Sequence, residues 1–369
     1  MTSCDVALCY ETRPQVIEAS VLRTELARRC TVLAIDAGLK LEYTLQAFNY
    51  EQLSVVPPDL FLEVGPGSAA EQTAAVLLRL EAVLRERQPR AVVVMGDTNA
   101  TLGFALAAAS LRIPVVHVQA GLRARDAGIP EEVNRRAVDA ISRVLCTPSA
   151  SATRRVRAER PDAIVVETGD IAFDAVLGQS GHLPDPVRLL PAGCQAPYIL
   201  AILHRAELTQ DPAVLLGVVA ALGRLERHVL LPVHPRTRQI LESLGNRLPP
   251  NGLVHLVASP GYRDSLALIR GAELVISDAG GVERKAYWLG VPGLTLRDET
   301  EWEEVAACGA TKLLSPGAAD RLPAAVREQL ARWSGGERWP NDAYGAGHAA
   351  RAVAAATTGL LAGTAFTMA

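Results

Sequence analysis

Short apolar runs alternate with helix-like segments from Val6 to Gly169, and the same alternation restarts at Tyr198 and continues to Leu296. This order is typical of a parallel sheet with helices on both faces, because parallel strands are joined by crossovers that are usually helical. A chain of 369 residues also exceeds the size at which a single core stops growing. We therefore predict an α/β fold with two Rossmann-like, doubly wound domains that face a central cleft.

The composition changes between the two alternating halves, where glycine, proline and short apolar segments are frequent. We predict an N-terminal domain over residues 1–172, a linker over 173–196 and a C-terminal domain over 197–350. Residues 351–369 are predicted to form a helix that packs back on the body. This stretch carries four threonines and two glycines, so we do not expect it to span a membrane.

The charge and cysteine content exclude several classes of partner. The chain has 37 Lys and Arg against 40 Asp and Glu, so no basic field attracts nucleic acid or an anionic membrane. The six cysteines are scattered without a C-x-x-C pair, and the N-terminus lacks the features of a signal peptide. We expect a cytoplasmic protein with a small-molecule substrate, without a structural zinc ion and without nucleic-acid or membrane partners.

Polar side chains follow successive predicted strands in the first half. Asp97 follows one strand, His117 and Gln119 lie at the end of the next, and Glu131 and Glu132 come after the following turn. Ligands bind at this edge in open α/β sheets, and clustered carboxylates there suit proton transfer. A lone Asp at such a place is more often the N-cap of the next helix, so the interpretation of Asp97 as catalytic depends on its neighbours.

The second half offers groups suited to an anionic ligand. The glycine turn over 278–281 opens a helix, whose N-terminal N–H groups and dipole suit a diphosphate, although close strand-to-helix packing also explains such a turn. His204 and Arg205 end another predicted strand, and an arginine there suits bidentate phosphate contact. His234 is more simply a structural histidine. The acidic loop over 297–301 either reaches a ligand or is solvated.

Ordered short motifs over nearly the whole chain resemble the UDP-N-acetylglucosamine 2-epimerase family, of which this chain looks like a divergent, non-hydrolysing member. The matching segments are 12–14, 96–98, 117–123, 130–135, 168–169, 204–205, 233–235, 277–281 and 297–301. The resemblance implies C2 epimerisation of UDP-N-acetylglucosamine, by elimination of UDP to a 2-acetamidoglucal and its re-addition. It further implies a GT-B-like homodimer that needs neither a cofactor nor a metal.

The resemblance also implies roles for individual residues. The catalytic set that it indicates is Asp97, Gln119, Glu131 and His204. The substrate-binding and UDP-binding set that it indicates is Arg13, Arg123, Arg205, His234, Ala279, Gly280, Gly281, Glu283 and Glu301.

The chain departs from the family pattern at positions that the family uses. Gln119 stands where the family has Glu, and Glu18 stands where it has Lys, so one acid–base group is missing and one charge is reversed. Ala279 replaces a serine at the diphosphate turn. Lys285 replaces the glutamate that holds the ribose hydroxyls, so UDP binding is weakened, or rebuilt with a group such as Glu283, or replaced by a different ligand mode.

These departures leave other functions open. The chain could be a hydrolysing 2-epimerase that releases UDP and N-acetylmannosamine, or a nucleotide-sugar-binding protein that has lost catalysis. A glycosyltransferase is disfavoured, because the carboxylates of the first half match the epimerases segment by segment.

Overall fold

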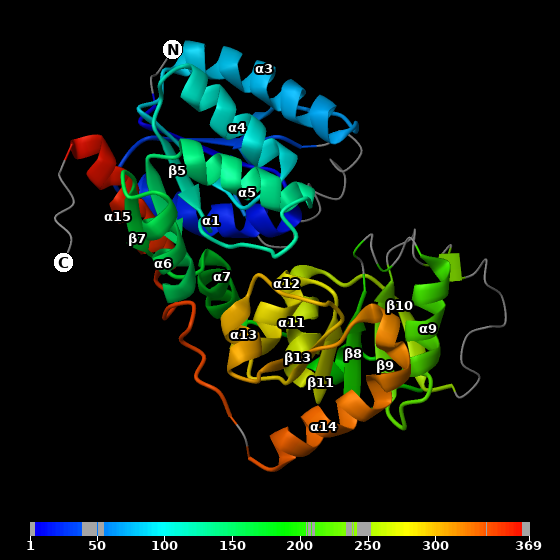
Figure 1. Ribbon diagram of the computed structural model, residues 1–369. Coiled ribbons are helices and arrows are strands. Elements are labelled where there is room, and N and C mark those ends of the chain that lie inside the picture. The colour runs from blue at the N-terminus through cyan, green and yellow to red at the C-terminus, as the bar shows by residue number, and fades with distance from the viewer. Residues whose placement is uncertain are drawn as a thin grey trace. The chain divides into compact units, whose positions relative to one another are not determined.

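A computed structural model describes residues 4–38, 50, 55–203, 205, 208, 211–233, 238, 240–241, 252–336 and 338–363. The chain forms two compact units (Figure 1). Unit 1 comprises residues 1–178 and 342–369, and unit 2 comprises residues 179–341. Among the described helices, none is both long and apolar enough to cross a membrane.

Unit 1 is built on a seven-stranded sheet in the order β3-β2-β1-β4-β5-β6-β7, in which every pair of neighbours is parallel. The order reverses between β1 and β4, which defines a topological switch point of the kind that binds ligands in open α/β sheets. The strands are β1 (Val6–Tyr10), β2 (Val32–Asp36), β3 (Leu60–Phe61), β4 (Ala91–Met95), β5 (Val115–Val118), β6 (Val144–Thr147) and β7 (Ile164–Glu167).

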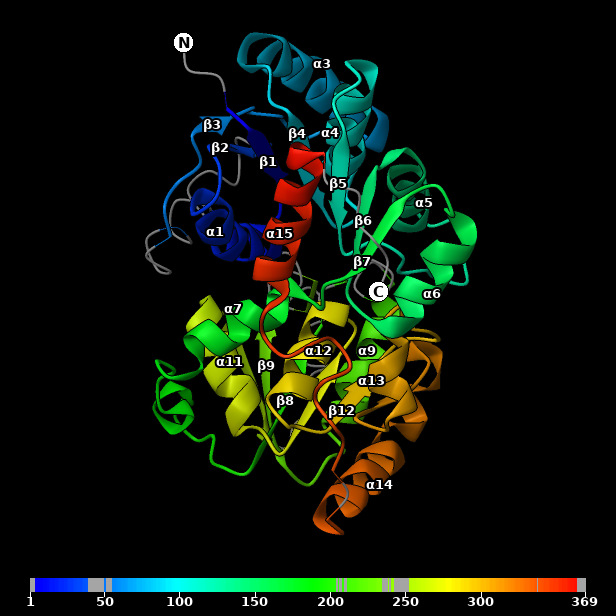
Figure 2. The ribbon, with the colours of Figure 1, turned by 90° about the vertical axis from the view of Figure 1, so that its left-hand side faces the viewer.

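Two hydrophobic cores cover the two faces of this sheet. In β1, Val6 and Leu8 belong to one core, and Ala7 and Cys9 belong to the other, because successive side chains of a strand point to opposite faces. Helices α1 (Arg13–Ala27) and α15 (Ala349–Ala362) pack side by side on the first face (Figure 2). Helices α3 (Ala69–Arg87) and α4 (Asn99–Ser110) pack on the second. The unit is completed by α5 (Pro130–Ile141), α6 (Ala150–Glu159) and α7 (Ile171–Ser180).

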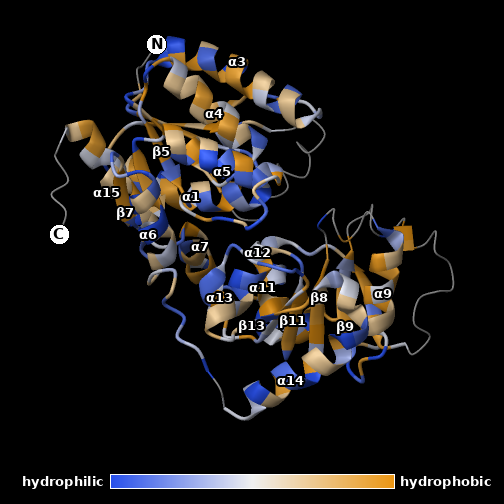
Figure 3. Ribbon diagram, viewed as in Figure 1, coloured by the Kyte–Doolittle hydropathy of each residue, from blue (hydrophilic) through white to orange (hydrophobic). Residues whose placement is uncertain are grey.

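Unit 2 repeats the plan with a six-stranded parallel sheet in the order β10-β9-β8-β11-β12-β13 and a switch point between β8 and β11. Figure 3 shows β8, β9 and β11 as hydrophobic, as expected of strands covered on both faces. The strands are β8 (Tyr198–Ile202), β9 (His228–Val233), β10 (Val254–Ala258), β11 (Leu274–Ser277), β12 (Gly293–Thr295) and β13 (Thr311–Leu313). The helices are η1 (Pro186–Leu189), α9 (Pro212–Leu222), α11 (Tyr262–Gly271), α12 (Gly280–Trp288), α13 (Glu303–Ala307), η3 (Pro316–Arg321) and α14 (Leu322–Ser334).

The segment predicted as a linker contains regular structure. Residues 173–180 continue α7, and 186–189 form the short helix η1. The division into domains over 1–172 and 197–350, with a terminal helix over 351–369, stays a prediction.

Candidate active site

Asp97 lies in the turn that connects β4 to α4. The turn depends on Gly96, whose φ of +68° is in the left-handed region that favours glycine. The N-cap of α4 is Thr98, whose side chain accepts a hydrogen bond from the Thr101 N–H, so the N-cap interpretation of Asp97 is wrong. Asp97 instead places Oδ2 2.6 Å from Nη2 of Arg135, and its side chain stays 29% exposed. The carboxylate is therefore held in place and still accessible.

The adjacent residues Glu131 and Glu132, at the start of α5, have different environments. Glu132 is fully buried, and its oxygens accept hydrogen bonds from the Ala124 N–H at 2.8 Å and from Nε of Arg136 at 2.7 Å. Glu131 is half-buried, and its carboxylate makes no hydrogen bond or ion pair with the described residues. Glu131 is thus the more accessible of the two glutamates, whereas Glu132 holds the local structure together.

Gln119, which follows β5, lies between two buried carboxylates. Its Nε2 donates to Oε2 of Glu18 on α1 and to Oδ1 of Asp170, both at 3.2 Å. Glu18 is 3% exposed and Asp170 is fully buried. A glutamate at position 119 would have no proton to donate when ionised, so the amide and the reversed charge at Glu18 complement each other. The two departures from the family pattern in unit 1 therefore contact each other.

This complementarity makes a double-mutant cycle informative. We expect Gln119→Glu to lower the free energy of unfolding by about 1–3 kcal/mol, because the new carboxylate loses both hydrogen bonds and faces Glu18 and Asp170. Adding Glu18→Lys restores an opposite charge next to position 119 and is expected to recover most of this loss. Urea unfolding of the wild type, both single variants and the double variant measures the coupling. Additive effects of the two changes would contradict the paired arrangement.

His117 is buried inside a hydrogen-bond network of unit 1. Its Nδ1 lies 2.7 Å from Oδ1 of Asp139, and its Nε2 lies 2.8 Å from the Gly96 carbonyl oxygen. Arg123 also pairs with Asp139, at 2.7 Å, and with Glu159. Burial raises the pKa of Asp139, but the hydrogen bond and charge of His117, together with Arg123, outweigh it and hold the pKa below its usual value. This network connects Arg123 and Asp139 through His117 to the Gly96 turn.

The N-terminus of α12 in unit 2 is open. A Cβ at Gly280 would lie 2.5 Å from Nε1 of Trp302 and 3.1 Å from Oε1 of Glu301, so only glycine fits there. A Cβ at Gly281 would meet no atom within 4 Å. The first turn of α12, which begins after its N-cap Ala279, can therefore offer its N–H groups to an anion.

Hydrogen bonds at the switch point of unit 2 hold this turn against β8. Oδ2 of Asp278 accepts from the Arg205 N–H at 2.9 Å, and the Ser277 hydroxyl donates to the Ile202 carbonyl at 2.9 Å. The Ser277 hydroxyl oxygen also accepts from the Ala279 N–H at 3.1 Å. The backbone of Arg205 is thereby placed beside the turn over 278–281. His204 and His234, which the sequence pointed to, lie outside the described residues.

Glu283 is 4% exposed on α12, where its Oε2 accepts a hydrogen bond from the Thr300 hydroxyl at 2.9 Å. Its Oε1 is buried and has no partner among the described residues. Burial raises the pKa of Glu283 to about 8. At neutral pH the side chain is therefore protonated and can both donate and accept a hydrogen bond. Glu301, in the same region, forms an ion pair with Arg297 at 2.7 Å.

The raised pKa of Glu283 makes stability depend on pH. The folded protein keeps a proton that the unfolded chain releases, so the free energy of unfolding falls as the pH rises from about 4.5 to about 8. We expect Glu283→Gln to remove this dependence, because the amide is neutral throughout. The difference in the free energy of unfolding between the wild type and the variant, measured by urea unfolding, should change by about 1.4 kcal/mol per pH unit in this window. A difference that does not vary with pH would show that Glu283 is ionised in the folded state.

Several residues of these two regions were not among those predicted from the sequence. Asp170 directly follows the matched segment 168–169 beyond β7, so its position at the same edge of the sheet was a usable signal. Arg135 lies four residues after Glu131 on α5, a spacing that places the two on one face of the helix. No local pattern predicted the hydrogen bond between Thr300 and Glu283, which are joined only in the folded unit.

Two doubly wound parallel sheets define an α/β protein of the GT-B-like class, and the predicted α/β fold is confirmed. The family model of UDP-N-acetylglucosamine 2-epimerase matches residues 24–358. The chain belongs to the UDP-N-acetylglucosamine 2-epimerase family.

Individual relatives support this assignment. The chain is 35% identical over 328 residues to the UDP-2,3-diacetamido-2,3-dideoxy-D-glucuronate 2-epimerase of Pseudomonas aeruginosa, which covers 87% of this chain and 90% of that protein. It is 32% identical over 322 residues to the UDP-N-acetylglucosamine 2-epimerase of Methanocaldococcus jannaschii, which covers 84% of this chain and 88% of that protein. The crystal structure of the M. jannaschii UDP-GlcNAc 2-epimerase with UDP-GlcNAc and UDP matches with a TM-score of 0.85 and 30% identity, over 96% of this chain and 99% of that chain.

Proposed function

We propose that this protein is a non-hydrolysing epimerase that interconverts UDP-N-acetylglucosamine and UDP-N-acetylmannosamine at C2. The observation that carries the proposal is the pair of carboxylates in unit 1, neither of them fully buried. Asp97 lies in the turn after β4, where Arg135 holds it, and Glu131 lies in the first turn of α5. The hydrolysing reaction and a loss of catalysis, which the sequence left open, are not favoured in a chain that matches epimerases over most of its length.

The reaction needs a placed base and a placed acid. One carboxylate takes the C2 proton while the C1–O bond breaks and its electron pair leaves with UDP, and a C1=C2 double bond forms. A second carboxyl group then delivers a proton to the opposite face of C2 as UDP attacks C1 again. Asp97 and Glu131 are proposed for these two steps, and general acid–base catalysis of this kind contributes about 10²- to 10⁴-fold to a rate. Gln119 is proposed to orient the sugar, since its amide cannot accept a proton as a base.

Unit 2 is proposed to hold the UDP group. The N–H groups of Gly280 and Gly281 suit the diphosphate, whereas the Ala279 N–H already donates to the Ser277 hydroxyl oxygen. The Arg205 guanidinium is proposed to contact the same diphosphate, because the backbone N–H of Arg205 is held at this turn by Asp278. Glu283, protonated at neutral pH, is proposed to take over the ribose hydroxyls, because Lys285 cannot accept their protons. The Lys285 ammonium lies 5.3 Å from the ring centre of Tyr262, and so has a different neighbour.

Further residues complete the proposed substrate set. Arg13 is exposed at the start of α1, beside the switch point of unit 1, where the guanidinium and the helix N-terminus both attract an anion. His204, His234 and Glu301 are kept in the proposed set because of the family pattern. Arg123 is proposed to act indirectly, through the network with Asp139 that fixes the Gly96 turn.

A second candidate substrate is UDP-2,3-diacetamido-2,3-dideoxy-D-glucuronate. The relative that acts on it is 35% identical to this chain, against 32% for the M. jannaschii UDP-N-acetylglucosamine enzyme. The departures at Glu18 and Gln119, which contact each other, support a substrate that differs from the common one of the family. The chemistry at C2 would be the same, and the substrate would differ by an acetamido group at C3 and a carboxylate in place of the C6 hydroxymethyl group.

Proton NMR in deuterium oxide tests the proposal with both substrates in parallel. Loss of the C2 proton signal together with the UDP-linked manno epimer is expected for UDP-N-acetylglucosamine. Free UDP with N-acetylmannosamine would instead establish hydrolysis. Turnover of the diacetamido uronate alone would establish the second substrate, and no exchange with either would refute the proposed activity.

We also propose that the enzyme works as a homodimer in the cytoplasm. Light scattering on purified protein tests the assembly, and a single-chain mass at micromolar concentration would contradict it. Fractionation of the source cells tests the location.

A further inference from the structure

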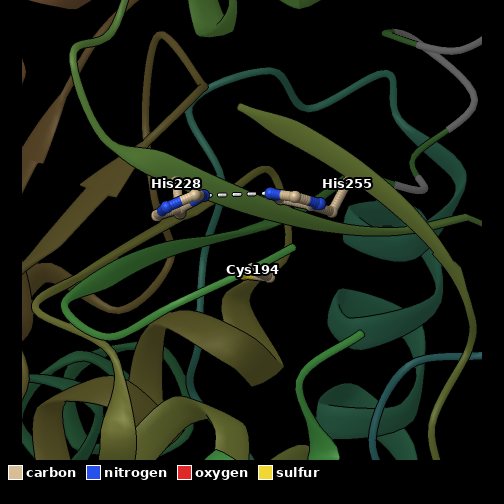
Figure 4. Close-up of side chains that lie close together, drawn as sticks. All are labelled: Cys194, His228 and His255. Atoms are coloured by element: carbon tan, nitrogen blue, oxygen red, sulfur yellow. Dashed lines mark hydrogen bonds between the residues drawn. The ribbon is translucent and has the colours of Figure 1, made fainter. Parts of the chain in front are cut away.

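Cys194, His228 and His255 come together in unit 2, outside the proposed nucleotide site (Figure 4). His228 is the first residue of β9 and His255 is the second residue of β10, its parallel neighbour. Cys194 lies in the segment that leads from η1 into β8, and Tyr198 of β8 is in register with His228. Two adjacent strands, β9 and β10, and the segment that precedes β8 therefore bring three metal-ligating side chains to the edge of the sheet where these strands begin.

The spacing of the three side chains fits a metal ion. One donor atom from each residue lies within 4.8 Å of the other two, and Nδ1 of His228 is 3.0 Å from Nε2 of His255. In a tetrahedral zinc site, bond lengths of about 2.0–2.1 Å to nitrogen and about 2.3 Å to sulfur place two nitrogens about 3.3 Å apart and a nitrogen and a sulfur about 3.6 Å apart. The nitrogen–nitrogen distance of 3.0 Å is close to the tetrahedral value, and a donor atom of Cys194 lies within 4.8 Å of a nitrogen of each histidine, so the three donors are close enough to share one ion.

The chemistry of the donors selects the kind of ion. One cysteine sulfur and two imidazole nitrogens form a set that suits Zn²⁺, and no carboxylate belongs to the cluster in the part of the chain that the structure describes. Calcium and magnesium ions, which require oxygen ligands, do not fit. We propose that Cys194, His228 and His255 bind one Zn²⁺ ion, with water as the fourth ligand.

Cys194 is well placed to serve as the anchoring ligand. It is buried among Tyr198, Leu200 and Leu230 of the second core of unit 2. Burial raises the pKa of its thiol, so the metal-free protein carries an S–H group there. When the ion binds, the metal–sulfur bond forms, the S–H bond breaks, and the proton goes to solvent.

The site is separate from the proposed catalytic groups of unit 2. Arg205 and the turn over 279–281 follow the carboxyl ends of β8 and β11, whereas the cluster lies where β8, β9 and β10 begin. These are opposite edges of a parallel sheet. The ion is therefore inferred to fasten the segment before β8 to the edge strands β9 and β10, and the metal-free epimerisation mechanism is unchanged.

Cobalt titration tests this inference. Tag-free protein, stripped with a chelator, is titrated with Co²⁺, which substitutes for Zn²⁺ and reports its ligands in the absorption spectrum. We expect one ion per chain, a thiolate-to-cobalt charge-transfer band, the visible bands of a tetrahedral complex, and displacement by Zn²⁺. Cys194→Ser should lose the charge-transfer band, and His255→Gln should weaken binding at least tenfold. Cys308→Ser is the matched control, because Cys308 is a half-buried free cysteine of the same unit outside the cluster.

Two measurements on the wild type keep the test decisive if a variant does not fold. X-ray absorption of the zinc-loaded protein should show one sulfur at about 2.3 Å and nitrogens at about 2.0–2.1 Å. The melting temperature should rise with Zn²⁺, as expected for a ligand that binds only the folded state. Absence of sulfur ligation, or a charge-transfer band that survives Cys194→Ser, would overturn the site and leave the histidines as a simple hydrogen-bonded pair.

Discussion

Asp97→Asn is expected to lower kcat by about 10²- to 10⁴-fold and to leave the fold intact. The substitution keeps the shape of the side chain and removes the group that exchanges a proton with C2. Arg135 loses its charged partner at position 97 but keeps Oε2 of Glu132 at 3.1 Å, so the buried guanidinium stays compensated. Initial rates of epimerisation and of C2 proton exchange, with circular dichroism of the same samples, measure both parts of the prediction.

Asp59→Asn provides the matched control for Asp97. Asp59 also belongs to unit 1, forms an ion pair with Arg23 at 2.8 Å and is 38% exposed, close to the 29% of Asp97. It lies before β3, away from the carboxyl ends of β4 and β5, so its loss should leave kcat unchanged. Equal rates for Asp97→Asn and the wild type would remove Asp97 from the mechanism.

Glu131→Gln is expected to lower activity and to leave stability unchanged, whereas Glu132→Gln is expected to lower stability. Glu131→Gln should lower kcat by about 10²- to 10⁴-fold and change the free energy of unfolding by less than about 0.5 kcal/mol, since the carboxylate has no partner among the described residues. Glu132→Gln should lower the free energy of unfolding by about 3 kcal/mol, because a buried carboxylate and its arginine contacts are lost. Urea unfolding and steady-state kinetics on both variants separate the two effects.

The two adjacent variants control for each other, because they differ by one position on α5 and carry the same chemical change. A stable Glu131→Gln enzyme with wild-type kcat would exclude Glu131 as an acid–base group. If Glu132→Gln proved as stable as the wild type, its hydrogen bonds to Ala124 and Arg136 would not be holding the start of α5.

Much of the proposed site could be predicted from the sequence, because its residues directly follow the ends of predicted strands. The apolar runs and glycine turns placed Asp97, Gln119 and the turn over 278–281 at carboxyl ends of parallel strands, and the structure has them there. The sequence did not indicate that Thr98, and not Asp97, is the N-cap of α4. The hydrogen bond between Gln119 and Glu18 could not be predicted either, because hydrogen bonds between residues far apart in the chain leave no periodic pattern in the sequence.

By itself, the sequence determined the α/β class, the two doubly wound sheets and the family, because strand-and-helix alternation and ordered motifs are local properties of the chain. Only the tertiary structure decided which of two adjacent glutamates is accessible, why Glu283 keeps its proton, and that Cys194, His228 and His255 share one edge of a sheet. The physical reason is that burial and charge compensation depend on which residues fold next to each other, and strand order sets these neighbours independently of distance along the chain.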